Sequence, residues 1–142
     1  PTNLLNHREV ISGFVQSCLD AENFFDAFDS GLSALPIDEW LAGSVATYQN
    51  GSPTTARIFL EQIRRSKGMS LEEMFQMELV IAYQCIRHPD FPEGVRALLV
   101  DKDKNPAWVY QSASDVPEEY LDEHFQPVWP GVHPLSDLAS GG

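Results

Sequence analysis

Apolar residues recur along the chain at helical spacing, and no segment keeps the strict alternation that is typical of a half-buried strand. Residues 8–20 show the pattern clearly, with apolar side chains at Val10, Ile11, Phe14, Val15, Cys18 and Leu19. Similar spacing predicts further helices over residues 21–32, 36–48, 53–67, 71–87, 90–99 and 117–125. We therefore expect an all-α fold, a bundle of about five to seven helices.

Local signals mark several of the predicted helix ends. Ser52 before Pro53 is a typical helix start, because the serine can cap and the proline has no N–H to lose in the first turn. Ser70 and Glu73 have the spacing of a capping box. Asp90 and Glu93 repeat that spacing, so we interpret Glu93 as a reciprocal cap at the start of a short helix.

The predicted helix 71–87 is apolar on more than one face, which favours a position at the centre of the bundle. Glu78 lies in the middle of it, and an unpaired buried carboxylate is costly. We therefore expect Glu78 to form a buried ion pair with an arginine such as Arg57 or Arg87. A general acid or base is the alternative interpretation of Glu78.

The charge of the chain narrows its possible partners. A formal net charge of -12 argues against a nucleic-acid surface. No apolar run approaches the roughly 20 residues that a membrane span needs, so no membrane partner is expected. Two cysteines, Cys18 and Cys85, are too few for a disulfide framework and favour a reducing compartment.

Few residues suggest chemistry. The sequence contains neither a nucleophile elbow nor a glycine-rich phosphate loop, and we assign no catalytic residue. No metal site is expected, because no cysteine pair has ligand spacing and no two histidines stand four apart; the histidines are His7, His88, His124 and His133.

Lys102 and Lys104 alternate with Asp101 and Asp103 in a charged segment that ends at Pro106. This segment is either a solvated turn or a contact for the phosphates of a nucleotide-like ligand. The residues alone leave both interpretations open.

A longer stretch carries a resemblance. Residues 90–108 read DFPEGVRALLVDKDKNPAW, which resembles the C-terminal end of the crotonase (enoyl-CoA hydratase/isomerase) superfamily, in its 3-hydroxyisobutyryl-CoA hydrolase branch. Ser52-Pro53-Thr54, the segment 70–73 and the segment 117–125 resemble that family in the same order. The resemblance implies that residues 35–126 are the family's C-terminal helical region, and residues 1–34 match the family loosely. The prolines and glycines of residues 127–142 predict a loose tail.

The resemblance implies an acyl-CoA thioester hydrolase of valine breakdown, with CoA as part of the substrate and no separate cofactor. It also implies a homo-oligomer, and an upstream β/α spiral core in the same polypeptide that carries the oxyanion hole and the catalytic carboxylates. Lys102 matches a family lysine close to the CoA adenosine and phosphates. The register differs by one residue from simple hydratases, so Lys104 is kept as a second candidate. Glu93 and Gly94 are interpreted as structural, Gly94 giving room for close helix packing.

Two other functions remain open. As alternatives to the hydrolase, the chain is the tail of an enoyl-CoA hydratase or isomerase, or it is a stand-alone helical interaction module without activity or CoA affinity. The expected location is the cytoplasm of a bacterium, or the mitochondrial matrix if the host is a eukaryote.

Overall fold

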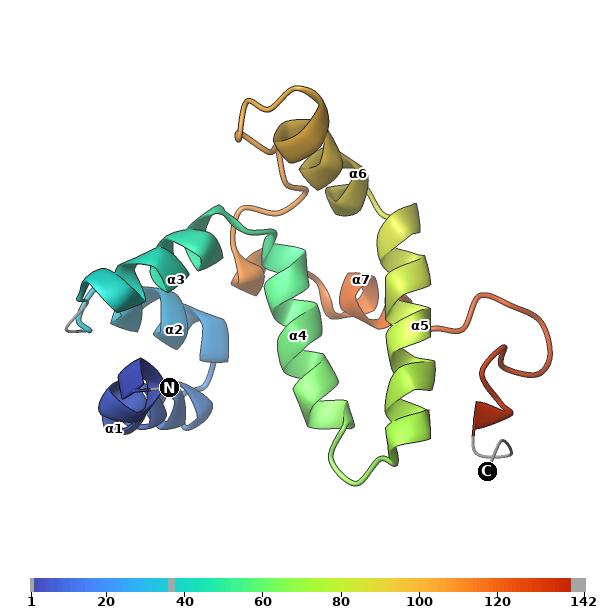
Figure 1. Ribbon diagram of the computed structural model, residues 1–142, viewed down its shortest axis with the longest axis horizontal. Coiled ribbons are helices and arrows are strands. Elements are labelled where there is room, and N and C mark those ends of the chain that lie inside the picture. Colours follow the sequence, from blue (N-terminus) through green and yellow to red (C-terminus); the bar gives the residue numbers. More distant parts are fainter. Residues whose placement is uncertain (1, 36–37, 139–142) are drawn as a thin grey trace. The chain divides into compact units, whose positions relative to one another are not determined.

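The computed structural model describes residues 2–35 and 38–138, and within these ranges it contains seven α-helices and no strand. The all-α prediction is confirmed. The chain divides into two compact units, residues 1–51 and 52–142, each described here by itself. Figure 1 shows the helices of both units.

The first unit contains α1 (Thr2–Leu19), α2 (Phe24–Leu32) and α3 (Glu39–Asn50). Helix α1 begins earlier than predicted, and α2 begins at residue 24 because the Asn23 side chain caps it, accepting hydrogen bonds from two backbone N–H groups. Asp38 caps α3 in the same way; the predicted start of that helix at residues 36–37 lies outside the described residues. The core of this unit includes Cys18, Phe25, Leu32 and Leu41.

The second unit contains α4 (Pro53–Arg65), α5 (Leu71–Arg87), α6 (Asp90–Val95) and α7 (Glu118–Glu123), with a π-helical turn η1 (Arg96–Val100) and a 3-10 turn η2 (Ala113–Asp115). The predicted caps of α4 and α5 are confirmed: Ser52 accepts from a backbone N–H in the first turn of α4, and Ser70 and Glu73 form a complete capping box. In Figure 1, α4 and α5 run in opposite directions, with α7 beside them.

Helix α7 is held to the α4–α5 pair by charged and aromatic side chains. Arg65 of α4 pairs with Asp122, with 2.8 Å between Nη2 and Oδ1, and its guanidinium lies 4.1 Å from the centre of the Phe125 ring. The ring of His88, the residue that follows α5, lies against the ring of the fully buried His124, with 4.0 Å between the ring centres. These contacts fix the short final helix, which has few residues of its own to bury.

Helix α5 differs from its prediction. Val80 and Gln84 are buried, but Leu71, Phe75 and Ile86 are about half exposed or more, so the helix is covered on one side only. Glu78 is exposed and accepts a hydrogen bond from Gln62 Nε2 at 3.2 Å.

The predicted buried ion pair of Glu78 is therefore wrong. Arg57 pairs instead with Glu118 of α7. Because Glu78 lies on the exposed side of α5, its carboxylate stays hydrated and needs no buried cationic partner.

The final segment runs back along α5. Gln76 donates from Nε2 to the carbonyl of Leu135 at 3.0 Å, and its own carbonyl accepts from His133 Nε2 at 3.1 Å. The Trp129 ring stands edge-on to Tyr83, with 6.0 Å between ring centres. Residues 139–142 of the predicted tail lie outside the described residues.

Candidate functional site

The candidate site is the charged turn that follows η1, and it is anchored by Asp90. Asp90 is only 8% exposed. One of its carboxylate oxygens accepts from Ser52 Oγ at 2.5 Å and the other from the Val109 backbone N–H at 2.9 Å. Asp90 thus ties the start of α4 to both ends of the segment 90–109.

The predicted cap at Asp90 and Glu93 is wrong. The residue before the helix is Pro89, and no side chain caps it. Asp90 instead takes the partners given above, and Glu93 turns to Arg96 and to the Ala107 N–H. A stronger partner, the guanidinium three residues on, explains why the Glu93 carboxylate does not serve the helix end.

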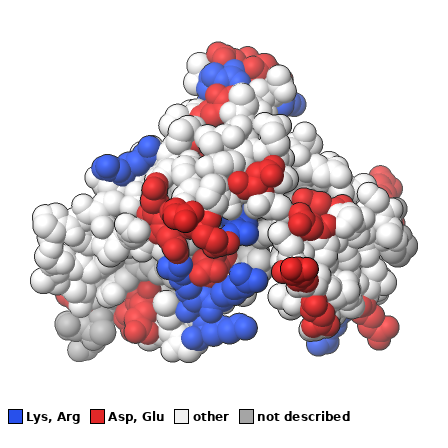
Figure 2. Space-filling view, turned by 180° about the vertical axis from the view of Figure 1, so that it is seen from behind, with Lys and Arg blue, Asp and Glu red and all other residues white. Residues whose placement is uncertain are grey.

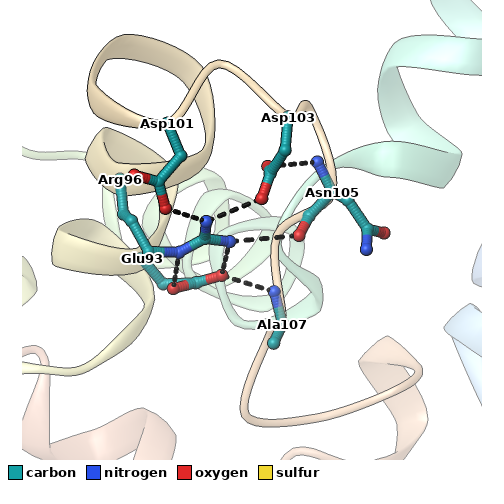
Figure 3. A network of polar contacts seen from close by, with 6 residues as sticks. All are labelled: Glu93, Arg96, Asp101, Asp103, Asn105 and Ala107. Atoms are coloured by element: carbon teal, nitrogen blue, oxygen red, sulfur yellow. Dashed lines mark hydrogen bonds and ion pairs between the residues drawn. The ribbon is translucent and has the colours of Figure 1, made fainter.

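Arg96 is the centre of the turn, as Figure 3 shows. Its Nε and Nη2 donate to the two oxygens of Glu93 at 2.9 and 2.7 Å, a bidentate pair. Its Nη1 donates to Asp101 Oδ2 at 2.6 Å and to Asp103 Oδ2 at 2.7 Å. Its Nη2 also donates to the Asn105 carbonyl at 3.2 Å. A single guanidinium therefore joins residues from position 93 to position 105.

Backbone groups close this network. The Asn105 N–H donates to Asp103 Oδ1 at 2.9 Å, and the Ala107 N–H donates to Glu93 Oε1 at 2.7 Å. Both carboxylates are therefore bound by Arg96 on one side and by the chain beyond the turn on the other (Figure 3).

The same contacts shift the ionisation of the network. Two causes lower the pKa of Glu93 to about 2: the hydrogen bonds from Arg96, which are the larger cause, and the hydrogen bond from the Ala107 N–H. Arg96 and the Asn105 N–H lower the pKa of Asp103, and the bonds to Glu93 and the two aspartates raise the pKa of Arg96. Glu93, Asp103 and Arg96 are therefore charged at neutral pH.

Lys102 and Lys104, the two predicted site residues, both lie in this turn and are exposed. Both have left-handed backbone conformations, with φ of 57° and 54°. The Lys104 N–H donates to the Ala97 carbonyl at 3.1 Å. Within the described part of the chain neither lysine makes an ion pair, whereas both neighbouring aspartates do. The structure thus brings the two lysines into one turn, in which Asp101 and Asp103 are paired with Arg96.

Gly94 and Trp108 pack against each other on the two sides of the turn in the sequence. A Cβ added at Gly94 would lie 3.3 Å from the Trp108 ring, so the glycine permits close packing against the chain that leaves the turn. Close packing at Gly94 is therefore present as predicted, but the predicted neighbour is wrong: it is the Trp108 ring and not another helix.

Charge is mixed in this part of the surface. Figure 2 shows red and blue atoms interleaved at the end of the second unit where α6 and the turn lie. The last turn of α4 is basic, with Arg64 and Arg65, but Arg65 is engaged by Glu61 and Asp122.

Other chemistry finds little support. Among residues 2–35 and 38–138, no three histidine, cysteine or carboxylate side chains are grouped as metal ligands would be. Burial raises the pKa of the Cys85 thiol and lowers the pKa of His124. None of the described helices is long and apolar enough to cross a membrane.

Arg96 is the residue that sequence reasoning missed. It stands in the stretch that carries the resemblance, but its role depends on carboxylates three residues before it and five and seven residues after it. The helical spacing of Glu93 and Arg96 was a usable signal. The pairs across the turn were not, because they need its left-handed backbone.

Comparison with known proteins places this chain in a family. A family model described as enoyl-CoA hydratase/isomerase matches residues 1–125. Three similar proteins carry the name 3-hydroxyisobutyryl-CoA hydrolase, mitochondrial. The Gallus gallus protein is 42% identical over 77 residues, which cover 54% of this chain and 20% of that protein. The Danio rerio protein is 34% identical over 127 residues, and the match covers 78% of this chain and 33% of that protein. The Homo sapiens protein is 41% identical over 75 residues, covering 53% and 19%.

The chain therefore spans between 19% and 33% of the length of these curated relatives. The family match, in contrast, extends over most of the chain and includes the Arg96 turn. The chain belongs to the enoyl-CoA hydratase/isomerase family.

Proposed function

We propose that this chain is the C-terminal helical part of an acyl-CoA thioester hydrolase of the 3-hydroxyisobutyryl-CoA hydrolase type, acting in valine catabolism. The observation that carries the proposal is the recurrence of that enzyme name among relatives 34–42% identical to this chain. The chemistry itself takes place in an upstream crotonase core of the same polypeptide. CoA is then part of the substrate and not a separate cofactor.

In this proposal the second unit contributes to the CoA site. Lys102, with Lys104 as second candidate, contacts phosphates at the nucleotide end of the acyl-CoA. Two observations support it: both side chains are exposed, and the acids beside them are already paired with Arg96. Lysine binds phosphate as a point charge, which suits an exposed turn.

The helices also cover the core and pack subunits of a homo-oligomer against one another. Support comes from the apolar side chains that α5, α6 and η1 leave uncovered within this chain, among them Ile86, Phe91 and Leu99. The relatives have mitochondrial in their names; a eukaryotic host would place this protein in the matrix, and a bacterial host in the cytoplasm.

The test is thiol release from 3-hydroxyisobutyryl-CoA, comparing chain 1–142 with the full translation product of its gene. We expect release by the longer product only, after subtraction of the background from the chain's own two thiols. No release by the longer product would contradict the proposal.

A second candidate is an enoyl-CoA hydratase or isomerase with the same helical end, which the family description favours. Hydration of an enoyl-CoA by the longer product, without thioester hydrolysis, would support this second candidate.

A further inference from the structure

Arg96 binds several parts of this turn at once, whereas an ordinary surface arginine forms a single exposed ion pair. Its guanidinium donates to three carboxylates and one carbonyl, from Glu93 to Asn105. Exposed ion pairs usually contribute little, but a bidentate pair within a network is the exception. This network spans the segment whose two lysines hold left-handed conformations. Such conformations persist where the surroundings over-determine them.

Arg96 also changes the charge that a ligand meets. Asp101 and Asp103 alternate with the two lysines, so an approaching phosphate would meet repulsion and attraction at neighbouring positions. Arg96 binds one oxygen of each aspartate at 2.6 and 2.7 Å and also pairs with Glu93, so it offsets part of the negative charge beside the lysines. The lysines have no ion-pair partner among the described residues. They are then the positive charges of the turn that a phosphate can approach.

We propose that Arg96 is a positioning residue for a phosphate-bearing ligand: it fixes the turn that presents Lys102 and Lys104 and pairs with the aspartates that alternate with them. The inference rests on the proposed function, in which this turn meets the phosphates of an acyl-CoA. Arg96 itself touches no ligand. Its contribution is preorganisation, which lowers the ordering cost of binding.

The test uses the full-length polypeptide and two thioesters of one acyl group, 3-hydroxyisobutyryl-CoA and the corresponding pantetheine thioester, which has no phosphate. We expect R96M to raise KM for the CoA ester about tenfold and to leave kcat unchanged. KM for the pantetheine ester should change less than about twofold, because the turn then has no phosphate to bind. K102M should show the same selectivity.

Two control variants complete the design. R64M removes an exposed arginine whose ion pair with Glu61 is long, at 3.8 Å, and it should leave both KM values unchanged. R96K keeps a charge at position 96 but cannot reproduce the bidentate geometry, so it should fold and still raise KM for the CoA ester several-fold.

Trypsin gives a readout that is independent of activity. If Arg96 orders the turn, R96M should be cleaved after Lys104 at least several-fold faster than the parent polypeptide, and R64M should not. Should R96M fail to fold, R96K decides the question by the same measurements.

The outcomes separate the two proposals. If K102M raises KM for the CoA ester while R96M and R96K do not, the turn binds phosphate but the role given to Arg96 is wrong. If R96M raises KM equally for both esters, Arg96 is merely structural. If neither K102M nor a matching K104M is selective for the CoA ester, the proposed phosphate contact is wrong. If the parent polypeptide turns over neither ester, the proposed function fails, and the Kd of CoA measured by calorimetry on the same variants tests Arg96.

Discussion

At the scale of single residues, two helical glycines of the first unit are expected to respond in opposite ways to alanine. A Cβ at Gly31 of α2 would lie 2.6 Å from a ring carbon of Phe14, whereas a Cβ at Gly13 of α1 meets nothing within 4 Å. G31A should destabilise the protein by about 1 kcal/mol, because overpacking outweighs the gain in helix propensity. G13A should stabilise it by about 0.5–1 kcal/mol.

Urea unfolding of both glycine variants in the same polypeptide checks this pair. A stabilised G31A would show that the Phe14 ring moves aside at little cost, and would contradict the close packing of α1 against α2.

His124 is the second residue whose behaviour follows from its surroundings. Burial lowers its pKa below the ordinary 6.5, while the Tyr120 carbonyl acts the other way and the neighbouring His88 lowers the pKa further. The unfolded chain therefore takes up the proton first, and stability is lost as the pH falls from 6.5 through the folded pKa. NMR titration should find the pKa of His124 below 6.5.

H88Q provides the matched change for that titration. Removing the neighbouring imidazole should raise the pKa of His124 but leave it below 6.5, since burial is the larger cause. A pKa of His124 at or above 6.5 in the parent protein would show that the ring is not buried as described.

At the scale of helices and turns, Arg65 should matter more than its neighbour Arg64. Arg65 pairs with Asp122 and Glu61 and lies over Phe125, whereas Arg64 has one long contact to Glu61. Loss of α7 docking should make R65A less stable by about 1 kcal/mol. R64A should change stability by less than about 0.5 kcal/mol. Thermal unfolding measures both, and equal effects would count against the role of Arg65.

Helices and their caps could be predicted where the signal is local. Ser52, and Ser70 with Glu73, act within a few residues of their own positions, and they form as expected. The same pattern at Asp90 and Glu93 fails, because Asp90 binds Ser52, 38 residues away, and Glu93 binds Arg96 and the Ala107 N–H. A sequence pattern cannot rank a local cap against a distant donor.

The candidate site shows the same division. The charged turn with Lys102 and Lys104 could be found from composition and resemblance. Its organisation could not, because the left-handed backbone and the role of Arg96 arise only when the carboxylates converge. The predicted burial of α5 on several sides was wrong for a different reason. Apolar periodicity indicates that a helix face is to be covered, but not which part of the polypeptide covers it.

At the scale of the whole molecule, the chain leaves a large amount of apolar side chain uncovered. Leu98, Leu99 and Val100 of η1 are 58, 68 and 68% exposed, and α5 adds Leu71 and Ile86. Three consecutive exposed apolar residues in η1 are more than the singly scattered ones that a soluble surface normally carries, and they favour a face that another surface covers. If these faces meet an upstream core, chain 1–142 by itself should self-associate and bind a hydrophobic dye. The full translation product should do neither.

Light scattering and dye fluorescence on the two products test this expectation. A monomeric chain 1–142 that binds no dye would argue for the stand-alone interaction module.

The two left-handed lysines imply a conflict between stability and binding. A non-glycine residue in that conformation costs about 1 kcal/mol, and glycine adopts it freely. Replacing Lys102, whose φ is 57°, with glycine should therefore relieve local strain, and unfolding experiments should find K102G at least as stable as the parent. If the proposed phosphate contact is right, the same variant binds acyl-CoA less well. Selection for stability alone would then remove the lysine, so its presence would reflect selection for the ligand.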